Sequence, residues 1–301
     1  MDILTLTLNP CVDRTRWVSD FGTLPFKTTV QSGGKGVNVA RVLTNLGASA
    51  LAIAPIGGAA GREFSELARA EGVELVTIPI AGETRVVETC VRAADYAQKV
   101  EVGVAPEMSE AECDALIACA KKYIPEARVL CVCGSACCER AAEAGRALLS
   151  YAKALGVKTL LDANGAALKL GAEALPDLIK PNQKELAELT QMTVPDGEED
   201  KSAQRLLERG IRLVLVSLGE RGAALFDMDT AIYCPAPRVE TVNPVGSGDS
   251  FVAGYLYAQL RGANQYASLS YACAAGAANA QVFEAARLHA PEIEALLGYK
   301  L

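Results

Sequence analysis

The segment NPVGSGDSF, residues 243–251, combines residue types that could transfer a charged group. Gly246 and Gly248 flank Ser247, and Asp249 follows immediately. The apolar residues after it recur at helical spacing, which predicts a helix that begins at this loop. The first amides of a helix have no partner within the helix, and glycine lets the backbone approach a ligand closely. The loop is therefore suited to bind a phosphate group.

Asp249 has two possible roles in this segment. An acid in the first turn commonly stabilises its own helix through the helix dipole. Alternatively, a carboxylate beside a phosphoryl group can act as a base that accepts the proton of an attacking hydroxyl. The segment alone supports both interpretations equally.

A second glycine-rich segment, QSGGKGVNVARVL, also leads directly into a predicted helix. It is not a P-loop, because no Lys-Ser/Thr pair follows the glycines, and it lacks the dinucleotide pattern G-x-G-x-x-G. The glycines at 33–36 could simply permit tight helix packing. Alternatively, Lys35 and Asn38 in a glycine-lined pocket could bind sugar hydroxyls or a phosphate.

Two further segments are interpreted together with the two glycine-rich segments. In KPNQKEL (180–186), Asn182 and Glu185 could form a capping box, or they could hold a hydrated magnesium ion. The segment VSLGERGAALF (216–226) is typical of a strand, a glycine-bounded turn and another strand. By itself this pattern predicts a hairpin. Together with the glycine-rich segments and KPNQKEL, it suggests a nucleotide-binding site.

The composition limits the classes of function. The chain has 301 residues, half of them apolar, which suits one large α/β domain or two modest ones. Its net charge is −7 and it has no run of basic residues, which argues against nucleic-acid binding. No stretch is long and apolar enough for a membrane span, and MDILTLTLNP lacks the basic start of a secretory signal. We therefore expect a cytoplasmic protein whose first residues form a strand.

Four of the ten cysteines lie close together in CVCGSACC: Cys131, Cys133, Cys137 and Cys138. A structural zinc site needs paired cysteines or added histidines at regular spacing, and the chain has one histidine, His289. We interpret the cysteines as reduced, small apolar packing residues.

Apolar runs alternate with helical patterns along most of the chain. Strands are predicted at 3–9, 51–56, 75–80, 129–133, 159–164, 178–182 and 213–218. Helices are predicted between them, at 37–47, 62–72, 109–123 and 139–156. This order predicts an α/β fold with a mostly parallel central sheet and helices on both faces. Segments 13–32 and 83–104 instead alternate polar and apolar residues, which predicts exposed antiparallel ribbons that form a small β-sheet lid or a dimer surface.

The motifs occur together in an order and spacing that resemble the PfkB/ribokinase-like sugar kinases along nearly the whole chain. They are NPCVDRT (9–15), SGGKGVNVARVL (32–43), KPNQKEL (180–186), SLGERGA (217–223) and NPVGSGDSFVAG (243–254). The chain is most similar to the phosphosugar branch of that family, that of 1-phosphofructokinase and tagatose-6-phosphate kinase. The resemblance implies a single ribokinase-like domain over residues 1–301, whose two ribbons form the lid.

The resemblance also implies roles for individual residues. Asp249 would be the catalytic base, and an anion hole would be formed by the amides of Gly246, Ser247 and Gly248. The sugar would be bound by Asp13, Gly34, Lys35, Asn38 and Ser135, and its phosphate by Arg85. Magnesium and the nucleotide phosphates would be organised by Glu185 and Asn182. The ATP side would be lined by Ser217, Gly219 and Gly222, with Asn279 near the adenine.

The sequence departs from the family pattern at three places. The loop CGSACCE (133–139) keeps Gly134 and Ser135 but lacks the usual proline, Val87 replaces a usual asparagine, and Lys27 replaces a frequent arginine. All three lie on the sugar side, so phosphoryl transfer is better supported than the choice of sugar.

The leading hypothesis is an ATP- and Mg²⁺-dependent kinase that converts fructose 1-phosphate to fructose 1,6-bisphosphate, with the phosphosugar and ATP as partners and a homodimer possible through the lid. The alternatives within the family are tagatose-6-phosphate kinase or another sugar kinase. A non-catalytic sugar-phosphate sensor is a different class. A dehydrogenase lacks its dinucleotide pattern here, and a serine hydrolase would have to use His289.

Overall fold

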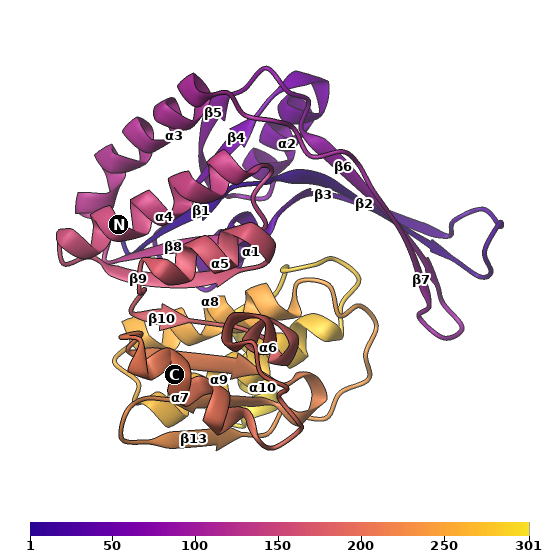
Figure 1. Ribbon diagram of the computed structural model, residues 1–301. Helices are drawn as coiled ribbons and strands as arrows, with labels where there is room; N and C mark the ends of the chain where they lie inside the picture. The colour runs from indigo at the N-terminus through magenta and orange to yellow at the C-terminus, as the bar shows by residue number, and fades with distance from the viewer. Residues whose placement is uncertain (301) are drawn as a thin grey trace.

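A computed structural model describes residues 1–300, which form an α/β fold around one large sheet (Figure 1). The sheet has nine strands in the order β13-β12-β11-β10-β9-β8-β1-β4-β5. Neighbouring strands from β11 to β5 are parallel, whereas β12 and β13 are antiparallel to their neighbours. The bounds are β1 (Ile3–Thr7), β4 (Ala50–Ile56), β5 (Glu74–Pro79), β8 (Val129–Gly134), β9 (Lys158–Ala163), β10 (Leu178–Ile179), β11 (Leu213–Ser217), β12 (Ala223–Phe226) and β13 (Ala231–Cys234).

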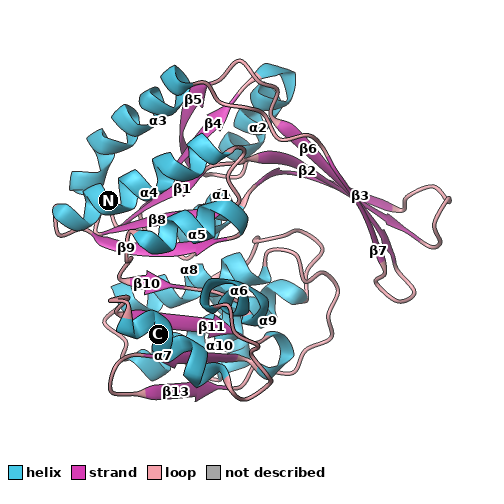
Figure 2. Cartoon of the chain, viewed as in Figure 1, coloured by secondary structure: helices cyan, strands magenta, loops and turns pink. Residues whose placement is uncertain are grey.

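Helices cover both faces of this sheet, as the sequence predicted (Figure 2). One face packs against α1 (Lys35–Asn45), α2 (Gly58–Ala70), α8 (Ser247–Leu260), α9 (Gln265–Ala280) and α10 (Ala290–Leu297). The other packs against α3 (Glu110–Tyr123), α4 (Glu139–Ala154), α5 (Gly165–Glu173), α6 (Gln183–Thr190) and α7 (Glu199–Glu208). Successive strand residues point to opposite faces, so Ile3 lies in the first core and Leu4 in the second.

Two differences from the predicted elements have a local cause. The strand predicted at 178–182 is reduced to β10, because Pro181 cannot donate a ladder hydrogen bond and the chain turns there to begin α6. Strand β13 was not predicted, since its short sequence AIYC has exposed residues at alternate positions and lies at the sheet edge.

The ribbons predicted at 13–32 and 83–104 form one four-stranded sheet in the order β3-β2-β6-β7. Its strands are β2 (Cys11–Val18), β3 (Lys27–Gly33), β6 (Arg85–Arg92) and β7 (Gln98–Val102). Each ribbon is antiparallel, and the two are joined by parallel pairing of β2 with β6. This sheet, which we call the lid, projects from the main body in Figure 1.

The lid packs against the segment 283–285 near the C-terminus. Trp17 of β2, the single tryptophan of the chain, is fully buried, and its ring meets the Phe283 ring edge-on with centroids 4.8 Å apart. Lys27 of β3 forms an ion pair with Glu284 at 3.0 Å. The Gln31 side chain accepts a hydrogen bond from the Ala285 amide and donates one to its carbonyl.

Cys131 and Cys133 of β8 are completely buried in the core beneath α1 and α8. Burial raises the pKa of both thiols far above its ordinary value, which keeps them protonated. Their position agrees with the interpretation as apolar packing residues. His289 is exposed and precedes α10, where it lies in a capping box with Glu292.

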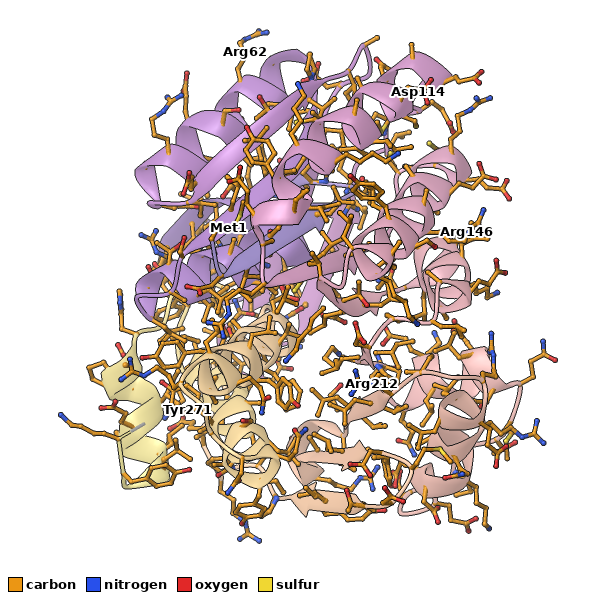
Figure 3. All side chains as sticks on the ribbon, turned by 90° about the vertical axis from the view of Figure 1, so that its left-hand side faces the viewer. Met1, Arg62, Asp114, Arg146, Arg212 and Tyr271 are labelled. Atoms are coloured by element: carbon orange, nitrogen blue, oxygen red, sulfur yellow. The ribbon has the colours of Figure 1, made fainter. Side chains whose placement is uncertain are left out.

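Met1 and Arg212 mark the edge at which the parallel strands begin, and this edge faces the viewer in Figure 3. The strands end at the opposite edge. At β1 the order of the strands reverses, because β4 and β5 lie on one side of β1 and the later strands, from β8 on, lie on the other. Ligands of open parallel sheets bind at such a point. None of the helices within residues 1–300 has the length and apolarity needed to cross a lipid bilayer.

Candidate active site

The glycine loop at 246–248 leads into α8, as the sequence predicted. Gly246 is the N-cap with a φ of 83°, a left-handed conformation that favours glycine. A side chain at Gly248 would meet no atom within 4 Å, so this position faces open space. Within the described chain, the amides of Gly246, Gly248 and Asp249 have no hydrogen-bond acceptor. These unpaired donors form an anion-binding corner at the helix N-terminus.

The structure changes one detail of the expected anion hole. The Ser247 amide donates to the Pro244 carbonyl at 3.2 Å, because the chain makes a turn before the helix begins. The unpaired set therefore contains the Asp249 amide in place of the Ser247 amide.

Asn279, which the family resemblance placed near the adenine, is completely buried in α9. Its Nδ2 donates to the Val245 carbonyl at 2.8 Å and to Ser247 Oγ at 3.1 Å. Its Oδ1 accepts a hydrogen bond from the Ala286 amide at 2.6 Å. These contacts hold the glycine loop in place, and a contact of Asn279 with the nucleotide stays a prediction.

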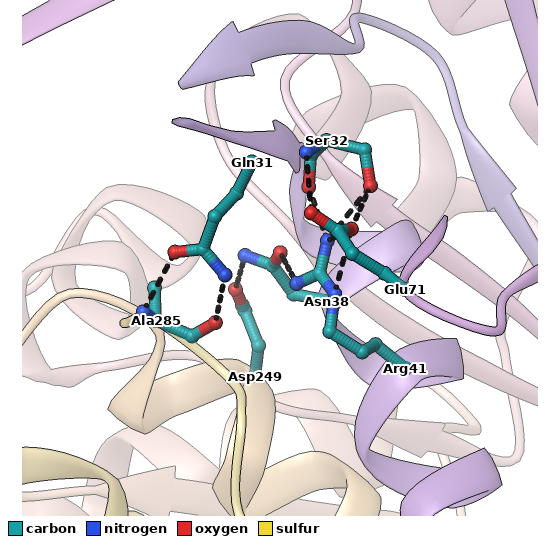
Figure 4. A network of polar contacts seen from close by, with 7 residues as sticks. All are labelled: Gln31, Ser32, Asn38, Arg41, Glu71, Asp249 and Ala285. Atoms are coloured by element: carbon teal, nitrogen blue, oxygen red, sulfur yellow. Dashed lines mark hydrogen bonds and ion pairs between the residues drawn. The ribbon is translucent and has the colours of Figure 1, made fainter. Parts of the chain in front are cut away.

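Asp249 lies in the first turn of α8 with 6% of its surface exposed. Its Oδ2 accepts a hydrogen bond from Asn38 Nδ2 at 2.7 Å, which joins α8 to α1 (Figure 4). Burial raises the pKa of Asp249 from 3.8 to about 6, and Lys35 opposes this rise. The carboxylate is therefore mainly ionised at pH 7 and is protonated as the pH falls below about 6. This protonation behaviour suits a base that works at neutral pH.

A buried charge cluster lies beside Asp249. Asp162 at the end of β9 is completely buried, and its Oδ1 lies 3.0 Å from Lys35 Nζ and 3.2 Å from Lys180 Nζ. Burial alone would lower the pKa of Lys35, but the neighbouring carboxylates, Asp162 first, raise it above its ordinary value. Lys35 therefore remains a cation beside the corner that would hold a phosphate.

Asp162 and Lys180 were not predicted as site residues from the sequence. Each directly follows the apolar residues of a predicted parallel strand, in LLDAN and LIKPN. Since parallel strands end at one edge of the sheet, polar residues at these two ends could have been predicted to meet there.

The glycines at 33–36 serve both purposes that the sequence left open. A side chain at Gly36 would lie 2.4 Å from Thr7 Oγ1, so glycine permits α1 to pack tightly against the end of β1. Gly34 has a φ of 115°, and its chain reversal starts α1 so that Lys35 and Asn38 reach Asp162 and Asp249.

The expected sugar side lies where the lid joins the main sheet. Arg85 at the start of β6 donates to the Asn9 carbonyl at 3.2 Å, and Asn9 Nδ2 donates to Ser135 Oγ at 3.1 Å. Burial raises the pKa of Asp13, and Arg85 lowers it. Arg85 Nε and Asn9 Oδ1 are buried and have no hydrogen-bond partner among residues 1–300. Asn9 is thus a further polar residue at this location, which we did not predict.

On the expected ATP side, Asn182 and Glu185 form a capping box at the start of α6. Asn182 Oδ1 accepts from the Glu185 amide at 2.9 Å, and Glu185 Oε2 accepts from the Asn182 amide at 2.8 Å. Ser217 ends β11 and pairs with Asn182 through a parallel bridge. This arrangement brings the two motifs side by side.

The two glycines of the SLGERGA motif differ in their surroundings. A side chain at Gly219 would meet no atom within 4 Å, so this residue faces open space. Gly222 has a φ of 100°, and a side chain there would lie 2.0 Å from the Cys234 carbonyl. Gly222 is therefore required by the packing of the chain near β13, whereas Gly219 is free to face a ligand.

Comparison with known proteins shows the family to which this chain belongs. The model of the pfkB family carbohydrate kinases matches residues 3–292. The chain belongs to the pfkB family of carbohydrate kinases. The structure of phosphofructokinase-2 from Escherichia coli, solved with substrates and products, is 30% identical, covers 99% of both chains and has a TM-score of 0.89.

Two more distant structures share the fold of this pfkB-family kinase. One is a possible 1-phosphofructokinase from Thermotoga maritima, which is 20% identical over 99% of this chain and 98% of its own, with a TM-score of 0.87. The other is the ribokinase of Arabidopsis thaliana, solved with ribose and ATP, at 20% identity over 99% of both chains and a TM-score of 0.75. The ribokinase-like fold predicted from the motifs is thus confirmed, and membership of the pfkB family makes the protein a carbohydrate kinase.

Proposed function

We propose that this pfkB-family kinase transfers the γ-phosphoryl group of ATP to a hydroxyl of a phosphorylated ketohexose. The contact between Asp249 and Asn38, beside the unpaired amides at the start of α8, carries this proposal. This contact brings a buried carboxylate and the Asn38 amide, which we propose binds the sugar, close to the unpaired amides. Arg85, which lies at the base of the lid with a buried Nε that has no partner among residues 1–300, supplies a cation for a second phosphate.

Phosphoryl transfer depends on positioning and charge neutralisation more than on covalent participation by the protein. In the proposed step, Asp249 accepts the proton of the sugar hydroxyl as that oxygen forms a bond to the γ-phosphorus. The bond from this phosphorus to the bridging oxygen breaks, and ADP leaves with that electron pair. The amides of Gly246, Gly248 and Asp249 neutralise charge on the transferred group. The lid excludes water, which would otherwise compete with the sugar for the phosphoryl group.

The residues of the site fit a magnesium ion. Magnesium prefers oxygen ligands and retains several waters. Glu185 has its carboxylate oriented by the capping box, and Asp162 Oδ2 is buried with no hydrogen-bond partner in the described chain. Glu185, through water, would hold the ion, with Asn182 beside it. Bound there, Mg²⁺ would neutralise charge on the nucleotide phosphates.

Two substrates are favoured by different observations. The motifs resemble those of the 1-phosphofructokinase branch, which favours fructose 1-phosphate, with tagatose 6-phosphate as the alternative in that branch. The likeness to phosphofructokinase-2 from Escherichia coli, also solved with fructose 6-phosphate at 29% identity, favours fructose 6-phosphate as the second candidate. Both fructose monophosphates would give fructose 1,6-bisphosphate.

The test is ADP release with MgATP across fructose 1-phosphate, fructose 6-phosphate, tagatose 6-phosphate, fructose and ribose. We expect kcat/KM for one phosphosugar to exceed that for both unphosphorylated sugars by about 100-fold or more, the effect of a charge-assisted phosphate contact. Binding of a phosphosugar without ADP release would indicate a sensor instead of an enzyme. Preference for fructose or ribose would remove the proposed role of Arg85.

We also propose that the lid forms a homodimer. The outer strand β7 is exposed along its whole length, and Val100, Val102 and Val104 are 51%, 61% and 90% exposed. Apolar side chains in a row on an edge strand favour pairing with another copy. Light scattering coupled to size-exclusion chromatography should give a dimer mass for the wild type, and a smaller mass for Val100→Lys/Val102→Lys. A wild-type mass equal to that of one chain would contradict the proposal.

A further inference from the structure

A buried ion pair lies behind the contact between Asn38 and Asp249. Arg41 follows Asn38 by three residues on α1, and Glu71 is the C-cap of α2. Their side chains are 1% and 4% exposed, and Arg41 Nη2 lies 2.7 Å from Glu71 Oε2. Arg41 Nε donates to the same oxygen at 3.0 Å. Neither residue was identified from the sequence as part of the site.

Arg41 determines which way the Asn38 amide points. Arg41 Nη1 donates to Asn38 Oδ1 at 2.8 Å, and Asn38 Nδ2 donates to Asp249 Oδ2 at 2.7 Å (Figure 4). An asparagine can present either its oxygen or its NH₂ group to a neighbour, and arginine can only donate. With its oxygen engaged by Arg41, Asn38 must turn its NH₂ group toward Asp249, where an acceptor lies.

The pair is also connected to the base of the lid. Ser32 near the end of β3 donates its amide to Glu71 Oε1 at 3.1 Å, and its Oγ donates to Glu71 Oε2. Arg41 Nη2 in turn donates to Ser32 Oγ at 2.8 Å and to the Ser32 carbonyl. Arg41 is therefore held at several points and has little freedom to reorient.

Stability alone does not require this arrangement. Burying two charges costs desolvation energy, and replacing a buried ion pair by apolar residues of similar volume is often neutral or stabilising. Removing one partner is instead strongly destabilising, since it leaves a buried charge uncompensated. This difference separates a structural role of the pair from a role in the active site.

We propose that Arg41, held in place by Glu71, is a positioning residue that fixes the Asn38 amide so that its NH₂ group orients the Asp249 carboxylate toward the sugar hydroxyl. The proposal rests on the proposed role of Asp249 as the base. Arg41 touches neither sugar nor nucleotide and acts entirely through Asn38.

The expected pH effect follows from the charges around Asp249. Besides Asn38 and Arg41, the titratable groups that face it are Lys35 of α1, Asp162 of β9, Lys180 after β10, Cys11 of β2 and Cys133 of β8. Burial raises the pKa of Asp249, and donation by Asn38 lowers it. Loss of that donation therefore raises the pKa of Asp249 further. A pKa of about 6 would place the acid limb of wild-type kcat/KM near pH 6, and we expect this limb to move to higher pH.

The test compares Arg41→Met with the double variant Arg41→Met/Glu71→Met, using MgATP with fructose 1-phosphate and fructose 6-phosphate. In the double variant no buried charge is left without a partner, so we expect it to unfold near the wild-type temperature. Both variants should show an acid limb displaced upward by about one pH unit and kcat lowered by about 10- to 100-fold, with KM for ATP unchanged. Arg212→Met, at the opposite edge of the sheet, controls for the loss of one positive charge and should match the wild type (Figure 3).

Each outcome decides the question. A folded double variant with the wild-type acid limb and kcat would overturn the proposal, because the pair would then be structural. Failure of the single and the double variant alike to fold would also overturn it, by assigning the pair to stability. Asp249→Asn in the same assay distinguishes a wrong assignment of the base from a wrong assignment of the role of Arg41. If that variant keeps its rate, the base is misassigned; if it loses its rate and Arg41→Met has no shifted limb, only the role of Arg41 is wrong.

Discussion

Asp249→Asn should lower kcat by about 10³-fold while leaving ATP binding nearly unchanged, since general-base catalysis typically contributes a factor of this order. The asparagine has the same shape and can still accept the hydrogen bond from Asn38, but it cannot take the proton of the sugar hydroxyl. Steady-state ADP release and equilibrium nucleotide binding measure the two effects separately. A variant rate within a few-fold of the wild type would mean that another group is the base.

The same variant should be more stable than the wild type at neutral pH. The folded state raises the pKa of Asp249 from 3.8 to about 6, so the buried group favours folding fully below about pH 4 and loses this contribution as the pH rises through about 6. At pH 8 the ionised carboxylate costs up to about 3 kcal/mol, at about 1.4 kcal/mol per pKa unit. Asparagine removes that cost, and thermal unfolding at pH 8 should show a higher Tm. The exposed Asp229, replaced by asparagine, is the matched control and should change neither rate nor Tm.

Arg85→Ala should raise KM for the phosphosugar by about 100-fold, because a hydrogen bond between charged groups contributes roughly 1.5–3 kcal/mol. Arg85 begins β6 and lies beside Asn9 and Asp13, where the lid meets the main sheet. KM for ATP should stay constant, since the nucleotide motifs lie across the site. Initial rates over a range of phosphosugar concentrations at saturating ATP measure the effect.

Arg92→Ala provides the control for this change. Arg92 ends the same strand and pairs with Asp95 and Asp20, well away from Asn9. It should leave both KM values as in the wild type. An unchanged phosphosugar KM in Arg85→Ala would remove the reason for choosing a phosphorylated sugar over a free one.

The sequence predicted the layout of the fold well because local patterns determine it. Buried parallel strands such as β4 and β8 are nearly continuous apolar runs, and the helices between them repeat at 3.6 residues. The lid was predictable for the opposite reason, since its strands alternate polar and apolar residues. Strand β10 was overestimated, because an apolar run does not show where Pro181 ends the hydrogen-bonded ladder.

The parts of the site that were missed depend on contacts between distant segments. Asp162 and Lys35 are separated by 127 residues and meet only after the sheet has formed. Glu71 lies at the end of an ordinary amphipathic helix pattern, as the C-cap of α2, and nothing in its neighbours indicates a buried partner. The glycine motifs were identifiable because backbone geometry requires glycine locally, whereas a charge partner is set by tertiary structure.

Trp17 gives this protein a built-in optical reporter. Its indole is fully buried between the lid and Phe283, and its Nε1 has no hydrogen-bond partner in residues 1–300. As the chain has one tryptophan, all indole emission comes from that junction. A dry, apolar setting gives short-wavelength fluorescence, and admission of solvent shifts it to the red. Changes in how the lid is seated can therefore be timed spectroscopically in the native enzyme, without attaching a dye.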